Sequence, residues 1–347
     1  MHQRRVLIFG GSGQDGSLLA FYLLSNESYA NSQIYVSATS LTETNLFRLR
    51  HLEILDKVHL FKFDMLCDDP SSIVQESDPD QVYILSGLTN TADSITSISL
   101  TAGVNVFGFS RILESLKKYS PETSIFVAGS SEMYGNGPIS TSAVTLDSNN
   151  TCIPTNPYGL SKLYQYHLVN QYRSFYSLDI SYGILFNHES ELRGRQFVTK
   201  KIVRNMTRFK YDSCHTFSLG NLSSARDWSS ARDFVQAFEM LVDLRANSSY
   251  IFASGTLTTV REFLSLTAEC LAINCHFEGS GLDELLICDT TGRCIASVSP
   301  RYYRTNDTKS LYGDPSRLTS EFCWKPTQSL ISLINHMVKY EDQFYNS

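Results

Sequence analysis

The sequence has little charge and no excess of basic residues. Charged side chains make up 18% of the 347 residues, and 35 acidic residues outnumber 29 lysines and arginines. A net charge of -6 argues against a nucleic-acid-binding protein that works through a broad basic surface. The densest basic pairs, Lys117-Lys118 and Lys200-Lys201, are interpreted as solvated helix faces. We therefore predict no nucleic-acid partner.

Long hydrophobic runs are also missing. No stretch of about 18 consecutive apolar residues occurs, so the sequence predicts no membrane span and no membrane partner. The first residues, 1–5, lead directly into a predicted core strand and leave no room for a cleaved signal. The expected compartment is the cytoplasm.

The cysteines form no metal-binding or redox pattern. No C-x-x-C pair occurs, and no histidines stand at zinc-site spacing, so we predict no metal site. We expect reduced thiols, mostly packed as small apolar groups. They are Cys67, Cys152, Cys214, Cys270, Cys275, Cys288, Cys294 and Cys323.

A glycine turn between an apolar strand and an apolar helix opens the chain. The run from Arg5 to Phe9 predicts a buried strand, and the run from Ser17 to Leu24 predicts a helix. Between them the glycines follow the spacing G-x-x-G-x-x-G, which permits a tight turn and lets a diphosphate approach the helix N-terminus. Directly after a first strand, this pattern favours a dinucleotide site over a plain turn. The predicted cofactor contacts here are Gly10, Gly13, Gln14, Asp15 and Gly16.

The end of the second predicted strand, Gln33 to Ser37, leaves the choice of dinucleotide open. An acid at this position is typical of NAD binding, whereas a basic residue is typical of NADP binding. Here the residues from Ser37 to Ser40 are neutral. Arg48 and Arg50 follow, and they either reach a 2′-phosphate or lie on a solvated helix. We predict NADP, with NAD as the alternative.

Two further strands extend the predicted sheet. They run from Val58 to Phe63 and from Gln81 to Leu85, and a long helix from about Ile95 to Tyr119 leads to another strand at Ser124. Each strand-helix-strand step implies a right-handed parallel crossover, so the ligand crevice should lie at the strand C-termini. The predicted cofactor contacts at these strand ends are Asp64, Met65, Leu85, Ser86 and Gly87.

Chemically reactive side chains follow the strand at 125–128. Ser130 and Glu132 stand at its end, and Asn156-Pro157 predicts a helix N-cap and first turn. Tyr158 and Lys162 are four residues apart on that helix and share one face. An ammonium beside a phenol stabilises the phenolate, which makes tyrosine a base near neutral pH. Each motif alone is common in turns or by chance; their combination indicates a catalytic site.

The rest of the chain supplies separated cations. Lys201, Arg226 and Arg304 suit a diphosphate-bearing substrate if they converge, and are three unrelated surface charges if they do not. The residues alone leave both readings open. We predict a dinucleotide-binding domain over 1–186 and a mainly substrate-binding domain over 187–347, with chain crossovers between them. The expected fold is α/β, a Rossmann-type doubly wound parallel sheet with a smaller C-terminal α/β domain.

These motifs resemble a known family. The glycine turn G-G-S-G-Q-D-G-S, the S-S-E-M-Y-G strand end and the P-Y-G-L-S-K helix start are similar to the extended short-chain dehydrogenase/reductase group. Within it, the motifs at 183–190, 197–202, 218–228, 260–263 and 302–304 resemble GDP-mannose 4,6-dehydratases. The likeness runs from about Arg5 to Pro326, and it favours convergence of the three cations.

The resemblance implies a lyase that removes water from a GDP-sugar by internal hydride recycling. It gives Tyr158 the role of catalytic base, Lys162 that of its assistant and ribose ligand, Glu132 that of a second acid/base, and Ser130 that of a hydrogen-bonding hydroxyl. It adds Leu185, His188 and Arg193 to the cofactor contacts. It implies a homodimer or homotetramer. The implied substrate ligands are Ser131, Asn187, Val198, Lys201, Leu219, Gly220, Arg226, Arg304 and Asp307.

The chain departs from the family pattern at three places. Thr39 and Ser40 stand where the family has two arginines, Leu88 and Asn90 where it has glutamine and histidine, and Glu191-Leu192 where it has proline and arginine. The first departure concerns the choice between NADP and NAD. The other two concern the choice of sugar or the packing of subunits. The alternatives are a dehydratase of another GDP-hexose or GDP-heptose, a GDP-sugar epimerase or reductase, and a non-catalytic nucleotide-binding protein.

Overall fold

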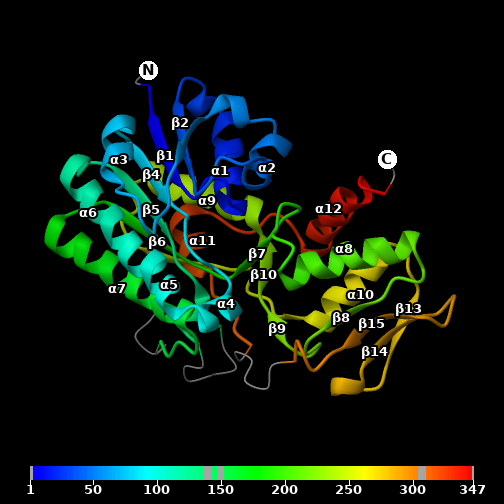
Figure 1. The fold of residues 1–347 in the computed structure, drawn as a ribbon. Helices are drawn as coiled ribbons and strands as arrows, with labels where there is room; N and C mark the ends of the chain where they lie inside the picture. Colours follow the sequence, from blue (N-terminus) through cyan, green and yellow to red (C-terminus); the bar gives the residue numbers. More distant parts are fainter. Residues whose placement is uncertain (1–2, 136–142, 147–151, 304–309, 346–347) are drawn as a thin grey trace. The chain divides into compact units, whose positions relative to one another are not determined.

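The chain divides into two compact units. The computed structural model describes residues 3–135, 143–146, 152–303 and 310–345 (Figure 1). The first unit comprises Met1–Phe186, Ala231–Phe252 and Asp314–Lys325, and the second comprises Asn187–Ser230, Ala253–Gly313 and Pro326–Ser347. The chain therefore passes between the units several times, and each unit is assembled from segments distant in sequence.

A seven-stranded, wholly parallel sheet forms the centre of the first unit. Its strand order is β3-β2-β1-β4-β5-β6-β11, in which the order reverses beside β1 as in a doubly wound nucleotide-binding sheet. The predicted Rossmann-type fold is confirmed. The strands are β1 Arg5–Phe9, β2 Gln33–Ala38, β3 His59–Lys62, β4 Gln81–Ile84, β5 Ser124–Ala128, β6 Ile180–Leu185 and β11 Ser249–Phe252.

Helices cover both faces of this sheet, so its central strands are apolar on both sides. All six residues of β6 and all four of β4 are buried. Figure 1 shows α3, α6 and α7 on one face and α1 and α9 on the other. The helices of the unit are α1 Gln14–Ser25, α2 Glu43–His51, α3 Ser71–Ser77, α4 Thr91–Thr96, α5 Ile98–Ala102, α6 Phe109–Tyr119, α7 Pro157–Tyr176, α9 Ala231–Asp243 and α11 Ser316–Phe322.

The long helix expected from about Ile95 to Tyr119 is present from Ile98 to Tyr119, and only its start differs, because α4 ends at Thr96. Its turns are not uniform, since α5 and α6 are joined without interruption by a π-helical stretch, η3 Gly103–Gly108. In η3 the Phe109 N–H donates to the carbonyls of Val104 and Val106. An α-helix would direct that N–H to the carbonyl of Asn105. The wider π-helical turn therefore releases one backbone acceptor in the interior of the unit.

The second unit is built around a mixed four-stranded sheet. Its strand order is β13-β14-β15-β8, with β15 and β8 parallel and the other pairs antiparallel. Two short pairs, β7 with β10 and β9 with β12, complete its strands. The strands are β7 Asn187–Glu189, β8 Phe217–Leu219, β9 Ala225–Arg226, β10 Trp228–Ser230, β12 Thr258–Thr259, β13 Cys275–Glu278, β14 Leu285–Cys288 and β15 Cys294–Val298.

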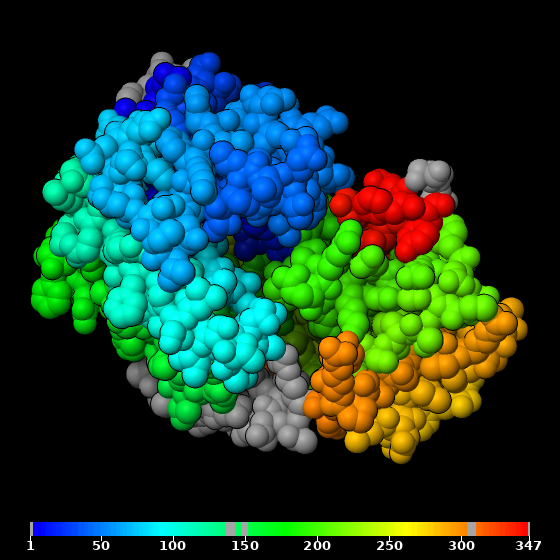
Figure 2. All heavy atoms as spheres, viewed as in Figure 1, coloured from blue at the N-terminus to red at the C-terminus, as the bar shows by residue number. Residues whose placement is uncertain are grey.

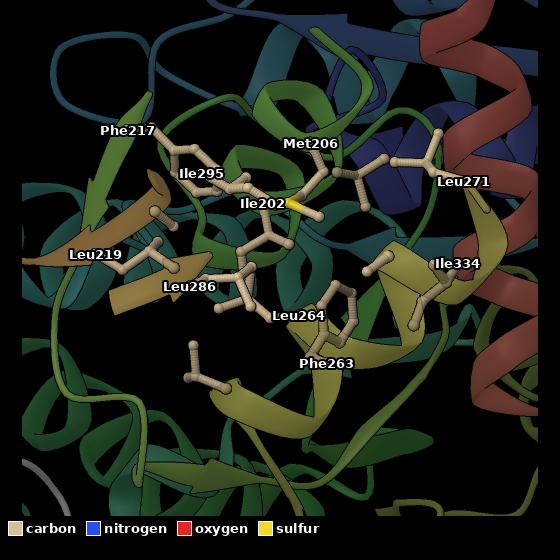
Figure 3. Packing of buried hydrophobic residues seen from close by; sticks show 14 of the residues in the cluster. Ile202, Met206, Phe217, Leu219, Phe263, Leu264, Leu271, Leu286, Ile295 and Ile334 are labelled. Carbon is tan, nitrogen blue, oxygen red and sulfur yellow. The ribbon is translucent and has the colours of Figure 1, made fainter. Parts of the chain in front are cut away.

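Three helices close the hydrophobic core of this unit. They are α8 Val198–Tyr211, α10 Val260–Cys270 and α12 Leu330–Asp342. Ile202, Phe263 and Ile334, one from each helix, are fully buried together with Leu286 of β14 (Figure 3). Figure 2 shows the C-terminal helix α12, in red, lying against the green surface of α8. The second unit thus has its own core.

The interpretation of Lys200 as part of a solvated helix face is wrong. Lys200 is 3% exposed, its Nζ lies 2.5 Å from Glu341 Oε1, and it donates to the carbonyl of Glu191 at 2.7 Å. Burial lowers the pKa of Lys200, while the neighbouring Glu341 acts in the opposite direction. Local sequence did not reveal this pair because Glu341 lies on α12, far along the chain.

The thiol prediction is correct in one respect and wrong in another. All eight cysteines are among the described residues and none forms a disulfide. Only Cys288 is buried, however; Cys67, Cys214 and Cys323 are exposed and the others intermediate. Cys288 belongs to the core of the second unit and Cys270 and Cys275 pack against it, so the packing prediction holds for these three and fails for the exposed thiols. Among the residues that the model describes, no helix is long and apolar enough to cross a membrane.

Candidate active site

The end of β5 and the start of α7 lie together in the first unit. After β5 the chain forms a short 3-10 turn, η4 Ser131–Met133, in which the Ser130 hydroxyl accepts a hydrogen bond from the N–H of Glu132 at 3.2 Å. Asn156 caps α7, since its Oδ1 accepts from the N–H of Gly159 at 2.8 Å, and Pro157 occupies the first turn. The predicted cap and helix start are confirmed.

Asn156 also holds the side chain of Glu132. Its Nδ2 donates to Glu132 Oε2 at 3.0 Å, while its Oδ1 remains on the helix cap. The backbones are equally close, because a Cβ on Gly159 would overlap the carbonyl of Glu132. The carboxylate is therefore fixed directly to the helix that carries Tyr158, although Glu132 and Tyr158 come from different elements.

Tyr158 and Lys162 are both buried on the first turns of α7. Lys162 Nζ lies 5.9 Å from the centre of the Tyr158 ring, with the tyrosine 7% and the lysine 4% exposed. Burial lowers the pKa of Lys162 from 10.5 to about 8. Its Nζ donates to the carbonyl of Ala128 at 2.7 Å and to Gln165 Oε1 at 3.0 Å. A positive charge is thus maintained near the phenol, where it stabilises a phenolate.

The glycine turn fits the diphosphate of a dinucleotide. Gly10 has φ +82°, and a Cβ there would lie 2.7 Å from the backbone of Ser86, so only glycine suits the position. Gly13 is the N-cap of α1 and carries no side chain to cap its N–H groups. Within the described part of the chain, the buried Ser86 Oγ has no hydrogen-bond partner. A bare helix N-terminus and an unused hydroxyl are donors suited to phosphate oxygens.

The two arginines after β2 have different environments. Arg48 Nη1 donates to the carbonyl of Ser12 in the glycine turn at 3.1 Å. Arg50 instead pairs with Glu43 at 3.3 Å, where both side chains are largely exposed. Arg48 therefore lies beside the predicted cofactor site, whereas Arg50 lies on a solvated helix face.

The remaining predicted cofactor residues of the first unit follow the strand ends. Asp64 Oδ1 accepts from the N–H of Leu66 at 2.9 Å, which shapes the turn after β3, and Met65 is buried. Gly87 has φ +154° and follows Ser86 directly. Leu85 directly follows the buried strand β4 and is partly exposed, and Leu185 is the last residue of β6. Gln14, Asp15 and Gly16 form the first turn of α1.

Other predicted ligands belong to the second unit and are dispersed over its elements. Asn187 and His188 are on β7, and Val198 and Lys201 are on α8. Leu219 ends β8, Gly220 follows it, and Arg226 is on β9. Ser131 lies in η4 of the first unit. Arg304 and Asp307 lie outside the described residues.

Three of these second-unit cations have defined surroundings. Lys201 Nζ lies 3.8 Å from the centre of the Tyr302 ring, a cation-π contact. Arg226 Nη1 donates to the carbonyl of Ala225 at 2.8 Å. Arg193 Nε lies 3.1 Å from Glu189 Oε2, and its guanidinium lies 3.6 Å from the Phe197 ring centre. Arg193 is therefore neutralised by a buried carboxylate.

Sequence patterns did not indicate two amides that the structure places beside the reactive groups. Asn156 was recognised as a cap, but its bond to Glu132 was not. Gln165 and its contact with Lys162 were missed because a glutamine at i+3 on a helix carries no signal by itself. The departures Leu88 and Asn90 also have structural roles: Asn90 caps α4, and the Leu88 backbone bonds the side chain of Asn105.

The parallel sheet, the glycine turn and the Tyr158-Lys162 pair define an extended short-chain dehydrogenase/reductase, a class that includes nucleotide-sugar epimerases and dehydratases. Solved structures share this fold. A dTDP-glucose 4,6-dehydratase from Bacillus anthracis in complex with NAD has TM-score 0.78 and 18% identity, with 98% of this chain and 97% of that chain covered. The RMD protein of Pseudomonas aeruginosa complexed with NADPH has TM-score 0.75 and 18% identity, with 98% and 99% covered.

The chain belongs to the GDP-mannose 4,6-dehydratase family, whose model matches residues 7–337. One relative, a GDP-mannose 4,6-dehydratase of Drosophila melanogaster, is 32% identical over 346 residues, which cover 96% of this chain and 85% of that protein. The resemblance seen in the sequence motifs is thereby confirmed, and the chain is an enzyme of the nucleotide-sugar dehydratase class.

Proposed function

We propose that this chain converts GDP-mannose to GDP-4-keto-6-deoxymannose with loss of water. Family membership over residues 7–337 supports the substrate and the reaction. The observation that carries the chemistry is the Glu132 carboxylate, held by Asn156 at the start of the helix that bears Tyr158. A reductase or 4-epimerase needs one proton-transfer group, whereas dehydration needs a second acid/base, and Glu132 supplies it.

In this proposal Tyr158 acts at C4 of the sugar. As a phenolate it takes the proton of the 4-hydroxyl, and the Ser130 hydroxyl hydrogen-bonds the same oxygen. The nearby Lys162 ammonium stabilises the phenolate in a buried, poorly solvated position. A nicotinamide dinucleotide, when bound, would supply the hydride acceptor for C4 and the hydride donor for C6. Protonation of C5 balances the proton that Tyr158 takes from the 4-hydroxyl, so the net reaction is loss of water and consumes no oxidant.

Glu132 acts on the neighbouring carbons. A ketone at C4 acidifies the C5 hydrogen, which Glu132 removes and then delivers to the departing 6-hydroxyl as water. Because Asn156 Nδ2 donates to Oε2, we assign the proton transfer to Oε1. The bond to Asn156 also keeps the carboxylate from rotating during the two transfers.

The cofactor in the proposal is a nicotinamide dinucleotide, NADP with NAD as the alternative. Gly10, the N-terminus of α1 and Ser86 would hold its diphosphate, and Lys162 its nicotinamide ribose. Arg48, placed beside the glycine turn by its bond to Ser12, is the residue suited to a 2′-phosphate. Thr39 and Ser40 supply no positive charge at the family's usual position.

The GDP part of the substrate is assigned to second-unit residues. We propose that Lys201 and Arg226 bind the diphosphate and that Asn187, Val198, Leu219 and Gly220 complete its contacts. Lys201 is suited to the role because the Tyr302 ring holds it in place and no acidic side chain among the described residues pairs with it. Arg304 and Asp307 are assigned to GDP binding on sequence grounds alone.

We further propose a homodimer or homotetramer. Large apolar side chains are exposed on α4, α5, η3 and α7, which pack on one another in the first unit. Phe107 is 67% exposed, and Ile98 and Leu160 are each 60% exposed. Clusters of this kind are typical of protein interfaces. Sedimentation of the wild type should show an assembly that Phe107→Glu with Leu160→Glu dissociates; a monomeric wild type would refute the proposal.

The compartment we propose is the cytoplasm. Eight cysteines without a disulfide, three of them exposed, suit a reducing environment. Thiol titration of the purified protein tests this assignment. The exposed thiols should stay reduced when reductant is added and oxidise without it.

A panel of GDP-sugars tests the activity. The purified protein is incubated with GDP-mannose, other GDP-hexoses and a GDP-heptose, and products are identified by mass spectrometry. The proposal predicts a product lighter by one water from GDP-mannose, with no net change in nicotinamide absorbance. Turnover of another GDP-sugar alone would reassign the substrate, and a product of unchanged mass would indicate an epimerase.

A further inference from the structure

The buried amide of Gln165 lies beside the ammonium of Lys162. Gln165 is 1% exposed and follows Lys162 by three residues on α7, so the two side chains share one face of the helix. Its Oε1 lies 3.0 Å from Lys162 Nζ, and its Nε2 lies 2.7 Å from the backbone carbonyl of Asn105. Both ends of the amide therefore have a partner in the interior.

The orientation of this amide is determined by its partners. A lysine ammonium only donates hydrogen bonds, and a backbone carbonyl only accepts them. Reversing Gln165 would direct its NH₂ group at Lys162 and its oxygen at Asn105, leaving two buried repulsive contacts in place of two hydrogen bonds. Gln165 Oε1 must therefore face Lys162.

The π-helical stretch η3 makes this arrangement possible. The Phe109 N–H donates to Val104 and Val106, so the carbonyl of Asn105 accepts from Gln165 instead of from the helix. The side chain of Asn105 bonds the Leu88 backbone and Ser161 Oγ, and Ser161 Oγ donates to the carbonyl of Tyr158. Gln165 is thus part of a hydrogen-bond network that is buried except at the Leu88 backbone.

We propose that Gln165 is a positioning residue, which directs the Lys162 ammonium toward the nicotinamide ribose and the Tyr158 phenolate. Of the three N–H bonds of the ammonium, the Ala128 carbonyl and Gln165 Oε1 take two in fixed directions. The third is thereby aimed at the ligand. This inference rests on the proposed function, since it assigns Lys162 the role described there.

Removing the amide oxygen has two measurable consequences. Lys162 would keep only the Ala128 carbonyl, so its ammonium would rotate more freely and bind the ribose less well. The charged form would also be less stabilised in a buried site, and burial already lowers the pKa of Lys162 to about 8. Activity that depends on the ammonium would therefore decline at lower pH than in the wild type.

The elements that pack against α7 near Lys162 carry other titratable groups. They are Asp93 on α4, Glu132 on η4 and Tyr182 on β6, together with Tyr158 on α7 itself. The Tyr182 hydroxyl donates to the backbone carbonyl of Lys162, not to its ammonium. Burial lowers the Lys162 pKa, and none of these groups causes the shift. A change in the pH profile after substitution of Gln165 is therefore assigned to Lys162.

Three variants separate positioning from a general structural role. Gln165→Met keeps the length of the side chain but removes the acceptor, and Gln165→Glu keeps an acceptor for Lys162. Gln81→Met is the matched control, because Gln81 is 6% exposed and accepts a buried hydrogen bond from Tyr29 away from the site. All three are compared with the wild type for NADP⁺ affinity by calorimetry, for kcat and KM against pH, and for thermal stability.

The proposal predicts that Gln165→Met binds NADP⁺ about tenfold more weakly, as expected for a lost hydrogen bond to a charged group. Its kcat should fall while KM for GDP-mannose stays near the wild-type value, and the alkaline limb of its pH profile should shift to lower pH. Gln165→Glu keeps the acceptor for Lys162 but places an oxygen against the Asn105 carbonyl, so it should recover part of the affinity and reverse the shift. Gln81→Met should lose stability only.

The proposal is overturned if Gln165→Met keeps wild-type NADP⁺ affinity and pH limbs, or if Gln165→Glu is as impaired as Gln165→Met. Failure of the proposed function would look different. In that case the wild type would not convert GDP-mannose, and the NADP⁺ titrations would still decide the role of Gln165.

Discussion

The first unit has its predicted reactive side chains on two adjoining elements, whereas the predicted ligands of the second unit come from four elements and the segment after β8. Ser130, Glu132, Tyr158 and Lys162 all lie in η4, its preceding residue or the first turns of α7. The side-chain amide of Asn156 holds Glu132, and that of Gln165 holds Lys162. The second-unit residues come from β7, α8, β8, β9 and the segment after β8. The predicted catalytic residues are therefore neighbours in the fold, whereas the predicted substrate-binding residues come from separate elements.

This difference predicts a division in kinetic effects. A change among the first-unit residues should lower kcat with little effect on KM, because the proposed mechanism has those residues act on the reacting atoms. A change among the second-unit residues should raise KM with little effect on kcat, because a diphosphate held by several cations contributes binding in both ground and transition states.

The largest expected effect is that of Glu132→Gln. Loss of a positioned acid/base should lower the rate of water loss about 10³-fold, within the range for general acid–base catalysis. NADP⁺ binding should be unchanged because the glycine turn is remote in sequence and on a different strand. Single-turnover mass spectrometry of the products measures this. A variant that still made 4-keto-6-deoxy product at the wild-type rate would remove Glu132 from the mechanism.

The adjacent lysines Lys200 and Lys201 separate folding stability from substrate binding inside the second unit. Lys200→Met should leave Glu341 buried without its partner and destabilise the protein by about 3 kcal/mol, as for other broken buried pairs. Its KM for GDP-mannose should not change. Urea unfolding and steady-state kinetics on the same preparation check both expectations.

Lys201→Met serves as the matched variant. It should unfold at the wild-type urea concentration and raise KM for GDP-mannose about tenfold, because one charge-assisted hydrogen bond to phosphate is lost. The interpretation fails if the two phenotypes are exchanged, or if both variants lose stability alone.

Asn156 tests whether Glu132 needs its amide partner. Asn156→Ser retains a helix cap but removes the bond to Glu132 Oε2, and Asn156→Asp retains the cap while placing a second carboxylate beside the first. Both should fold normally. Asn156→Ser should lower kcat several-fold and Asn156→Asp about tenfold, with KM unchanged. Equal kcat in both variants and the wild type would show that the contact has no role in the reaction.

The last prediction concerns folding stability alone, through the cost of burying Lys162. Its pKa is about 8 in the folded protein and 10.5 when unfolded, so above pH 8 the unfolded chain binds more protons than the folded one. Folding stability should therefore rise with pH between 8 and 10.5 by about 1 kcal/mol per unit from this group. The slope should be absent in Lys162→Met. Urea unfolding of both proteins across this range checks it, and parallel curves would contradict the burial of Lys162.

The sequence predicted the first unit well because its determinants are local. The strand-glycine-helix order from Arg5 to Ser25 and the Asn156-Pro157 cap depend on neighbouring residues, and both were found as expected. The features that the sequence did not reveal depend on contacts distant in sequence. The π-helical turns of η3 are coupled to Leu88 and Gln165, and the burial of Lys200 depends on Glu341.

Deuterium placed at C4 of GDP-mannose gives the most direct test of the central claim, that one set of first-unit residues performs redox and elimination on the same sugar. The product is isolated after complete turnover and its label is located by mass spectrometry and NMR. The account predicts that deuterium is found at C6 of the 4-keto-6-deoxy product. Deuterium remaining at C4, or a product that keeps its 6-hydroxyl, would contradict it.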